Sequence, residues 1–243
     1  DDGRIIFAIP YETDFTLIGT TDIDHLDLNE EPKCTELEKN YLINFANQYF
    51  KSELKVEDIV WTYSGVRPLR DTSEDNATAV TRDYSIKVNQ EDGVPLINVF
   101  GGKITTYRKL AESVMDEVGL FIPKIREPWT DNAHLPGGDF SVDGSPQLIS
   151  DLLTAFPFLN AKWAMRLVKA YGTEAFEMLG SVRNEEELGI NFGATLTQKE
   201  VEWLIKKEFA TSAEDILWRR SKLGLRLSEL QVNTLQDWIA DQN

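Results

Sequence analysis

The chain of 243 residues is 42% hydrophobic and 27% charged, a composition typical of a globular protein with one or two domains. Its formal net charge of -16 at pH 7 argues against a nucleic-acid-binding protein, because such proteins gain most of their affinity by neutralising phosphates. Every apolar run is shorter than the ~20 residues that a membrane-spanning helix needs.

Cysteine and histidine are scarce. The single cysteine, Cys34, excludes an internal disulfide and is typical of a protein from a reducing compartment. The two histidines, His25 and His134, are too few for a multi-histidine metal site, so we predict no metal. The sequence starts at Asp1 without a methionine and enters a strand pattern at once, so we expect it to be part of a longer protein.

The N-terminal segments predict a β-hairpin followed by a helix. Two mainly apolar segments, residues 4–11 and 15–19, flank the polar turn Glu12-Thr13-Asp14. Gly19-Thr-Thr-Asp22 follows, and we interpret it as a strand-end turn. The spacing of Thr35 and Glu38 is that of a capping box, which predicts the start of a helix there.

A strand is expected next, at residues 58–64, and it ends in the turn Gly65-Val66-Arg67-Pro68-Leu69. Arg67 is therefore held beside a glycine and a proline in a stiff turn, where its guanidinium could bind a carboxylate or phosphate through two hydrogen bonds. The alternative is a surface salt bridge, for example to Asp71.

The next strand pattern, at residues 77–88, carries Arg82 and leads through a hairpin turn at 89–93 into an apolar strand. That strand ends at Phe100, and helical spacing begins at Tyr107 and runs to a stop signal at Gly119.

Gly101, Gly102 and Lys103 thus lie where a strand turns into a helix. The first amides of a helix lack intrahelical partners and favour anions, and glycines allow a ligand to approach the backbone. Thr105 or Thr106 could cap this helix. The alternative is an ordinary turn that needs positive φ, with a solvated lysine. If Arg67, Arg82 and Lys103 converge, they form a pocket for a dianion.

Prolines and glycines between residues 123 and 144 indicate a loop and a domain boundary. We predict a β-rich portion with flanking helices at 1–127, a linker at 128–144 and an all-α domain at 145–243, which is an α+β fold class. In the last part Asn160 and Ser228 are predicted N-caps, and Thr197 and Glu200 have capping-box spacing. Residues 218–222 form either a basic patch or a solvated helix end.

Six motifs, taken in order, resemble the C-terminal half of the FAD-dependent glycerol-3-phosphate dehydrogenases over nearly the whole chain. They are Ile18-Gly-Thr-Thr-Asp22, Tyr63-Ser-Gly-Val-Arg-Pro-Leu69, Thr81-Arg-Asp-Tyr84, Val99-Phe-Gly-Gly-Lys-Ile-Thr-Thr-Tyr-Arg-Lys109, Leu135-Pro-Gly-Gly-Asp-Phe140 and Leu217-Trp-Arg-Arg-Ser-Lys-Leu-Gly224.

The resemblance implies a cytoplasmic flavoprotein, peripheral on the inner face of the cell membrane, that oxidises sn-glycerol 3-phosphate to dihydroxyacetone phosphate and passes the electrons to quinone. It also implies that the glycine fingerprint for FAD lies in an N-terminal part that this sequence lacks. The fragment alone is therefore expected to be inactive. A homodimer is a further possibility.

The resemblance also implies residue roles. Arg67 would bind the substrate phosphate with Arg82 beside it, and Lys103 would lie near the flavin and the reacting carbon. Gly101 and Gly102 would present amides to the flavin, where Lys103 and the helix start would stabilise negative charge. Thr105 and Thr106 would contact FAD or cap the helix. No general base is identified.

Two alternatives remain. A glycerol-3-phosphate oxidase of the same superfamily would pass the electrons to oxygen and form peroxide, and the motifs do not separate it from the dehydrogenase. The second alternative is a non-catalytic module whose helical domain docks a partner or a second subunit.

Overall fold

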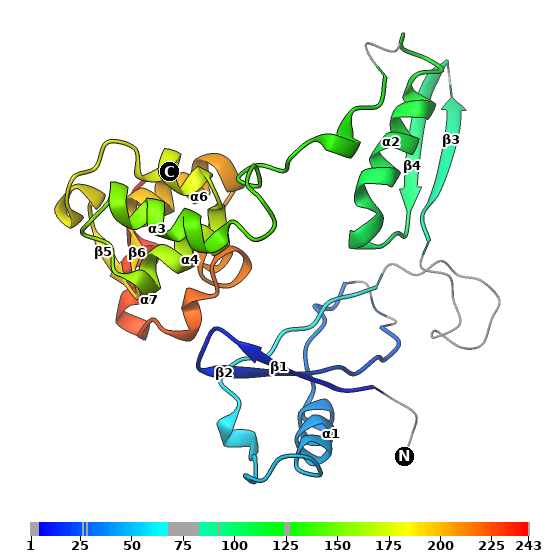
Figure 1. Ribbon diagram of the computed structural model, residues 1–243. Helices are drawn as coiled ribbons and strands as arrows, with labels where there is room; N and C mark the ends of the chain where they lie inside the picture. Colours follow the sequence, from blue (N-terminus) through cyan, green and yellow to red (C-terminus); the bar gives the residue numbers. More distant parts are fainter. Residues whose placement is uncertain are drawn as a thin grey trace. The chain divides into compact units, whose positions relative to one another are not determined.

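The computed structural model describes residues 5–25, 27, 29–67, 83–91, 93–123 and 127–242 (Figure 1). The chain divides into two compact units, Asp1–Pro128 and Trp129–Asn243. We call them the N-terminal unit and the C-terminal unit.

The N-terminal unit begins with the expected hairpin. Strands β1 (Phe7–Tyr11) and β2 (Phe15–Gly19) pair antiparallel, with Phe7 opposite Gly19 and Tyr11 opposite Phe15. The turn between them uses positive φ at Glu12 (45°) and Thr13 (73°), a conformation that matches the twist of paired strands.

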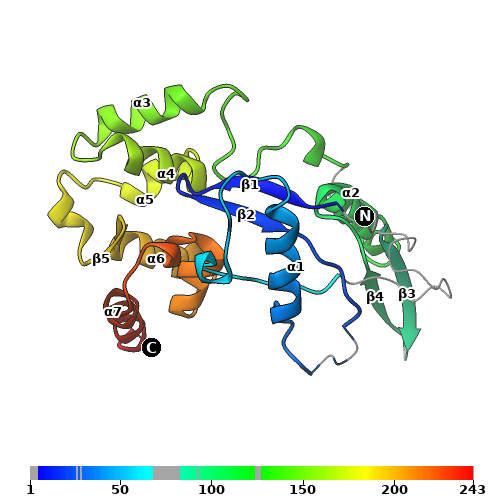
Figure 2. The ribbon, with the colours of Figure 1, turned by 90° about the horizontal axis from the view of Figure 1, so that it is seen from below.

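Helix α1 (Glu36–Ala46) follows, and Figure 2 shows it beside the hairpin. Its capping box is confirmed, because the Thr35 amide donates to Glu38 Oε2 at 2.8 Å and the Glu38 amide donates to Thr35 Oγ1 at 3.3 Å. These two bonds satisfy amide groups that a helix start would otherwise leave without partners.

The strand expected at residues 58–64 is wrong. A single 3-10 turn at Val56–Asp58 is followed by residues 59–67 without regular secondary structure. The rings of Trp61 and Tyr63 stack with centroids 5.0 Å apart. The apolar residues here line a cavity instead of pairing with a neighbouring strand. A composition typical of strands therefore did not produce a strand.

A second hairpin and a helix complete this unit. Strands β3 (Ser85–Glu91) and β4 (Val94–Phe100) pair antiparallel, and helix α2 (Tyr107–Val118) follows. The strands extend further into the turn region predicted at 89–93, while the helix begins and ends where predicted. The hydroxyls of Tyr84 and Ser113, 3.2 Å apart, link the hairpin to α2. Figure 1 shows α2 beside β4.

The C-terminal unit is mainly helical. Its helices are α3 (Ser145–Ala155), α4 (Ala161–Tyr171), α5 (Glu174–Leu179), α6 (Gln198–Glu208), a π-helical turn (Asp215–Arg220) and α7 (Glu229–Ala240). The predicted N-caps Asn160 and Ser228 are confirmed, each accepting a backbone hydrogen bond from the first turn of its helix. Leu152, Leu167 and Leu204 are among the fully buried core residues.

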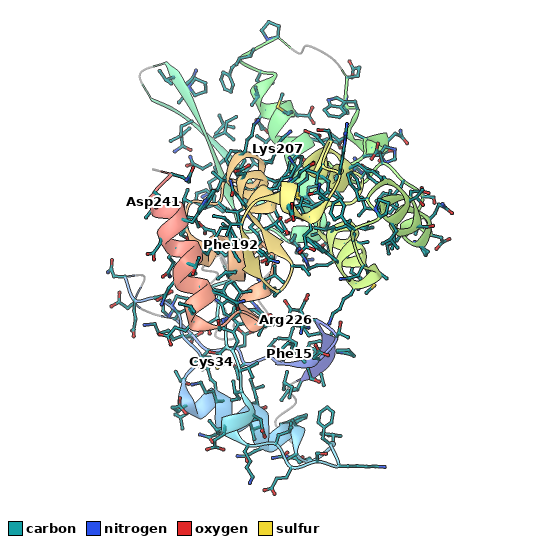
Figure 3. The ribbon with its side chains drawn as sticks, turned by 90° about the vertical axis from the view of Figure 1, so that its left-hand side faces the viewer. Phe15, Cys34, Phe192, Lys207, Arg226 and Asp241 are labelled. Atoms are coloured by element: carbon teal, nitrogen blue, oxygen red, sulfur yellow. The ribbon has the colours of Figure 1, made fainter. Side chains whose placement is uncertain are left out.

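The expectation of an all-α C-terminal domain is wrong in one detail. Strands β5 (Asn191–Gly193) and β6 (Leu196–Thr197) pair antiparallel around a turn with positive φ at Ala194 (48°) and Thr195 (71°). These strands are too short to show a period of two in the sequence. Phe192 anchors the pair in the core, 1% exposed, with its ring 5.8 Å from that of Trp238 (Figure 3).

Residues 129–144, predicted as a linker, are grouped with the C-terminal unit. Here the backbone of Gly137 crosses the end of α4 at Gly172. The Thr173 amide donates to the Gly137 carbonyl at 3.0 Å, and a Cβ on either glycine would overlap the backbone of the facing segment. The Leu135-Pro-Gly-Gly motif is thus explained by a close backbone contact.

The mixture of helices and strands agrees with an α+β fold class. Within the described part of the chain, no helix has the length and apolarity that crossing a membrane requires.

Candidate functional site

A large open cavity lies in the N-terminal unit, with a volume of about 1460 Å3. It is formed by the β1–β2 hairpin, α1 and the irregular residues 59–67. Its lining combines apolar side chains, aromatic rings and a few polar groups, among them Phe15, Thr21, Cys34, Trp61, Tyr63 and Arg67. Figure 3 labels Phe15 and Cys34. An apolar pocket with a small number of convergent polar groups is the usual form of a small-molecule site.

Arg67, predicted from its stiff turn, lies in this cavity. Its Nη1 donates to Asp22 Oδ2 at 2.7 Å, and the two side chains are 42% and 48% exposed. The partner suggested from the sequence, Asp71, lies outside the described residues. The ion pair joins two of the motifs, Gly19–Asp22 and Gly65–Leu69. Asp22 and Arg67 are 45 positions apart in the sequence.

Gly101 and Gly102 both require the backbone freedom of glycine. Their φ angles are +71° and +109°, which L side chains rarely adopt, and a Cβ on Gly102 would lie 3.5 Å from the Cβ of Tyr84. The chain can therefore leave β4 and turn into the helix start within three residues.

Within the described residues, no side chain caps the start of α2 or the 3-10 turn (Ile104–Thr106) that directly precedes it. Thr106 is at the N-cap position, but its hydroxyl donates to the Lys103 carbonyl at 3.0 Å instead of accepting from the helix. The first turn of α2 also contains no acidic residue. Of the predicted roles, Thr106 thus takes the cap position without forming the cap bond, and the helix start retains its preference for anions.

Lys103 lies directly before this helix start. Its Nζ is 3.5 Å from Asp83 Oδ1, and its side chain is 49% exposed. Arg67 and Lys103 are thus each paired with a different carboxylate. The third predicted cation, Arg82, lies outside the described residues, so the convergence of the three cations stays a prediction.

The basic segment 218–222 of the C-terminal unit is engaged within the protein. Arg219 donates to Glu214 at 2.9 Å and to Asp215 at 3.0 Å. Arg220 donates twice to the Glu208 carbonyl, and Lys222 donates to the Trp218 carbonyl. These contacts favour the interpretation as a helix end over a binding patch.

Sequence reasoning missed several residues of the cavity. It interpreted Gly19–Asp22 as a strand-end turn and gave no role to Trp61 or Tyr63. Membership of a motif could have identified Gly19–Thr21 and Tyr63, because the Gly19–Asp22 and Tyr63–Leu69 motifs both contribute to this cavity. Trp61 lies outside both motifs.

Comparison with known proteins identifies the family. Residues 1–108 match the model of FAD dependent oxidoreductases, and residues 128–240 match the model of the C-terminal domain of alpha-glycerophosphate oxidase. Residues 1–108 are thus similar to the FAD-dependent oxidoreductases. The resemblance seen in the six motifs is thereby confirmed.

Several curated proteins match over nearly the whole of this chain. Identity is 39% to the aerobic glycerol-3-phosphate dehydrogenase of Escherichia coli, over 99% of the chain and 48% of the relative. Identity is 41% to a glycerol-3-phosphate dehydrogenase of Pseudomonas aeruginosa, over 100% of the chain and 48% of the relative. Identity is 39% to the D-erythritol 1-phosphate dehydrogenase of Brucella abortus, over 100% of the chain and 48% of the relative. The chain thus spans about half the length of these relatives.

FAD is the cofactor of this family. The residues between β4 and α2 fit such a group, because the two glycines allow close approach and the uncapped helix start supplies N–H donors. Lys103 adds a positive charge beside them.

Proposed function

We propose that this chain is the C-terminal portion of a flavoprotein that oxidises sn-glycerol 3-phosphate to dihydroxyacetone phosphate. The observation that carries the proposal is the placement of Arg67 in the cavity of a chain whose relatives are named for phosphorylated polyols. Arginine suits a phosphate because its planar guanidinium offers parallel N–H donors.

In this proposal Arg67 binds the substrate phosphate and Arg82 lies beside it. Lys103 lies near the reacting carbon, and Gly101, Gly102 and the two threonines at 105 and 106 contact the cofactor. When bound, FAD supplies the acceptor for the hydride. Lys103 and the amides at the start of α2 stabilise the negative charge that then develops next to them.

The test uses the full-length parent protein under anaerobic conditions. Glycerol 3-phosphate should bleach the oxidised flavin absorbance, and unphosphorylated glycerol at the same concentration should not. D-erythritol 1-phosphate is the matched comparison, because it differs by one added hydroxymethylene unit. Bleaching by glycerol alone would remove phosphate recognition from the function, while faster bleaching by the erythritol phosphate would reassign the substrate.

Quinone is the proposed electron acceptor, which places the protein peripherally on the inner face of the cell membrane. The oxidase alternative is supported by the match of residues 128–240 to a domain named for alpha-glycerophosphate oxidase. The two acceptors are separated by measuring peroxide formation in air against reduction of a soluble quinone. Stoichiometric peroxide with slow quinone reduction would establish the oxidase.

The isolated chain, residues 1–243, should bind FAD weakly or not at all and have no turnover, because its sequence contains no Gly-x-Gly-x-x-Gly fingerprint for the pyrophosphate. Purifying it with excess FAD tests this point. Stoichiometric yellow flavin after gel filtration would contradict it.

We also propose that the C-terminal unit docks a second subunit. Phe209 and Leu230 are 83% and 76% exposed there, which is unusual for large apolar side chains. Replacing both by serine should convert a dimeric parent protein into a monomer in light scattering. A monomeric parent protein would exclude the role.

A further inference from the structure

We propose that Asp22 is a positioning residue that fixes the guanidinium of Arg67 in the cavity, and that Thr21 and Glu38 in turn hold the segment that carries Asp22. The inference rests on the proposed function, in which Arg67 binds the substrate phosphate. It gives the Gly19–Asp22 motif a role beyond that of a strand-end turn.

The first step is the contact between Asp22 and Arg67. Only Nη1 of the guanidinium is used by Asp22, at 2.7 Å. Within the described part of the chain, no further hydrogen bond of Arg67 is present, so Nε and Nη2 remain available to an incoming oxyanion. Guanidinium has five donors in a fixed plane, so one bond at Nη1 orients the others.

The second step is the support of the segment 19–22. Thr21 Oγ1 donates to Glu38 Oε1 at 2.6 Å. The other oxygen of Glu38 accepts the Thr35 amide at 2.8 Å, as part of the capping box. Glu38 is thus held on both oxygens and links the first turn of α1 to the residue before Asp22.

The charge of Glu38 is maintained by the same contacts. Burial alone would raise the pKa of this carboxyl, but the hydrogen bonds from Thr21 and Thr35 hold it below its ordinary value. Glu38 therefore remains an acceptor at neutral pH, and the Thr21 hydroxyl continues to donate its hydrogen bond to Glu38.

Two effects of Asp22 on phosphate binding oppose each other. Its negative charge weakens the attraction of Arg67 for a dianion, while its hydrogen bond removes rotamer freedom that Arg67 would otherwise lose on binding. Both side chains are over 40% exposed, so water screens the charge effect strongly. The orientation effect is therefore the larger of the two, so loss of Asp22 should weaken substrate binding.

The test measures KM and kcat for glycerol 3-phosphate in the full-length holoenzyme. Asp22→Ala should raise KM about three- to fivefold and leave kcat within about twofold. Asp22→Asn retains an acceptor oxygen and should restore most of the wild-type KM. Glu53→Ala, which removes the same charge at an exposed position of the N-terminal unit outside the cavity lining, is the control and should leave KM unchanged.

A double-mutant cycle links the effect to Arg67. In the Arg67→Ala background, Asp22→Ala should have no further effect on KM. The support by Glu38 is tested separately, since Thr21→Val should raise KM and Thr21→Ser should not. These two variants also carry the test if Asp22→Ala reduces the yield of folded holoenzyme.

The outcomes separate this inference from the proposed function. If Arg67→Ala leaves KM unchanged, the proposed phosphate role of Arg67 fails. If Arg67→Ala raises KM but Asp22→Ala and Thr21→Val do not, positioning by Asp22 is overturned alone. A lower KM in Asp22→Ala would identify Asp22 as a competitor of the substrate phosphate instead.

Discussion

The guanidinium of Arg166 and the carboxylate of Glu200 form a two-pronged ion pair inside the C-terminal unit, at 2.7 Å and 2.6 Å. Glu200 is 1% exposed and also accepts the Tyr171 hydroxyl at 2.7 Å. Burial and the adjacent carboxylate raise the pKa of Tyr171, so its hydroxyl keeps the proton that it donates. Arg166 also donates to Thr195 in the β5–β6 turn, at 2.9 Å. The pair therefore joins α4, α6 and that turn.

Glu200→Gln should destabilise the C-terminal unit by about 3 kcal/mol, because removal of one partner leaves a mostly buried guanidinium without its countercharge. Glu202→Gln on the same helix is the control, since Glu202 is exposed, and it should cost less than about 0.5 kcal/mol. Urea unfolding followed by circular dichroism measures both. Equal midpoints for the two variants would contradict the structural role of the pair.

Gly137→Ala should destabilise the C-terminal unit far more than Gly180→Ala. Both glycines have positive φ, +72° and +62°, so both substitutions carry the backbone strain of about 1–3 kcal/mol. Only the Cβ at 137 would overlap the carbonyl of Tyr171, whereas the nearest atom at 180 is 3.7 Å away. We expect the first variant to lose ~2 kcal/mol or more beyond the second. Similar melting temperatures would disprove the close contact.

Asp215→Asn should lower stability most at neutral pH, and this loss of stability should shrink as the pH falls below about 3.9. Hydrogen bonds from the Thr211 amide and from Ser212 hold the pKa of Asp215 far below its ordinary value. A group with a lowered folded pKa stabilises the fold above its unfolded pKa of about 3.9 and loses that contribution as the pH falls toward the folded pKa.

Urea unfolding of wild type and variant between neutral pH and about pH 3 measures this difference. Asp237→Asn, at an exposed position of α7, is the control and should show no such trend. A difference that grows as the pH falls would reverse the assigned sign.

Arg67→Ala should raise KM for glycerol 3-phosphate by about tenfold in the full-length protein, with a smaller effect on kcat. A hydrogen-bonded charge pair is worth about 1.5–3 kcal/mol, and the 42% exposure of Arg67 places the loss at the lower end. Arg67→Lys keeps the charge without the planar donors and should recover part of the loss. An unaffected KM in steady-state assays would remove Arg67 from the site.

Local signals in the sequence predicted local structure well. The capping residues Thr35, Asn160 and Ser228 and the β4-to-α2 turn act over four residues or fewer, so adjacent side chains decide them. The predicted capping box at Thr197 is wrong, because Arg166 and Tyr171 bind the Glu200 carboxylate that the box would need. A contact across 34 positions overrode the local pattern.

The candidate site was predictable only in part. Composition and spacing indicated Arg67 and Lys103, but Asp22 could not be chosen as the partner of Arg67, because their contact depends on how the β1–β2 hairpin and residues 59–67 fold together. The stacked Trp61 and Tyr63 were mistaken for strand residues for the same reason. Tertiary placement, rather than residue type, decides these positions.

The crossing of Gly137 and Gly172 has an evolutionary consequence. Each position excludes a side chain because of the other segment's backbone, so no second substitution can compensate for the first. Both glycines should remain unchanged in homologues that keep this fold, and correlated mutation between the two columns should be absent. Contact maps inferred from covariation would therefore miss this close backbone contact.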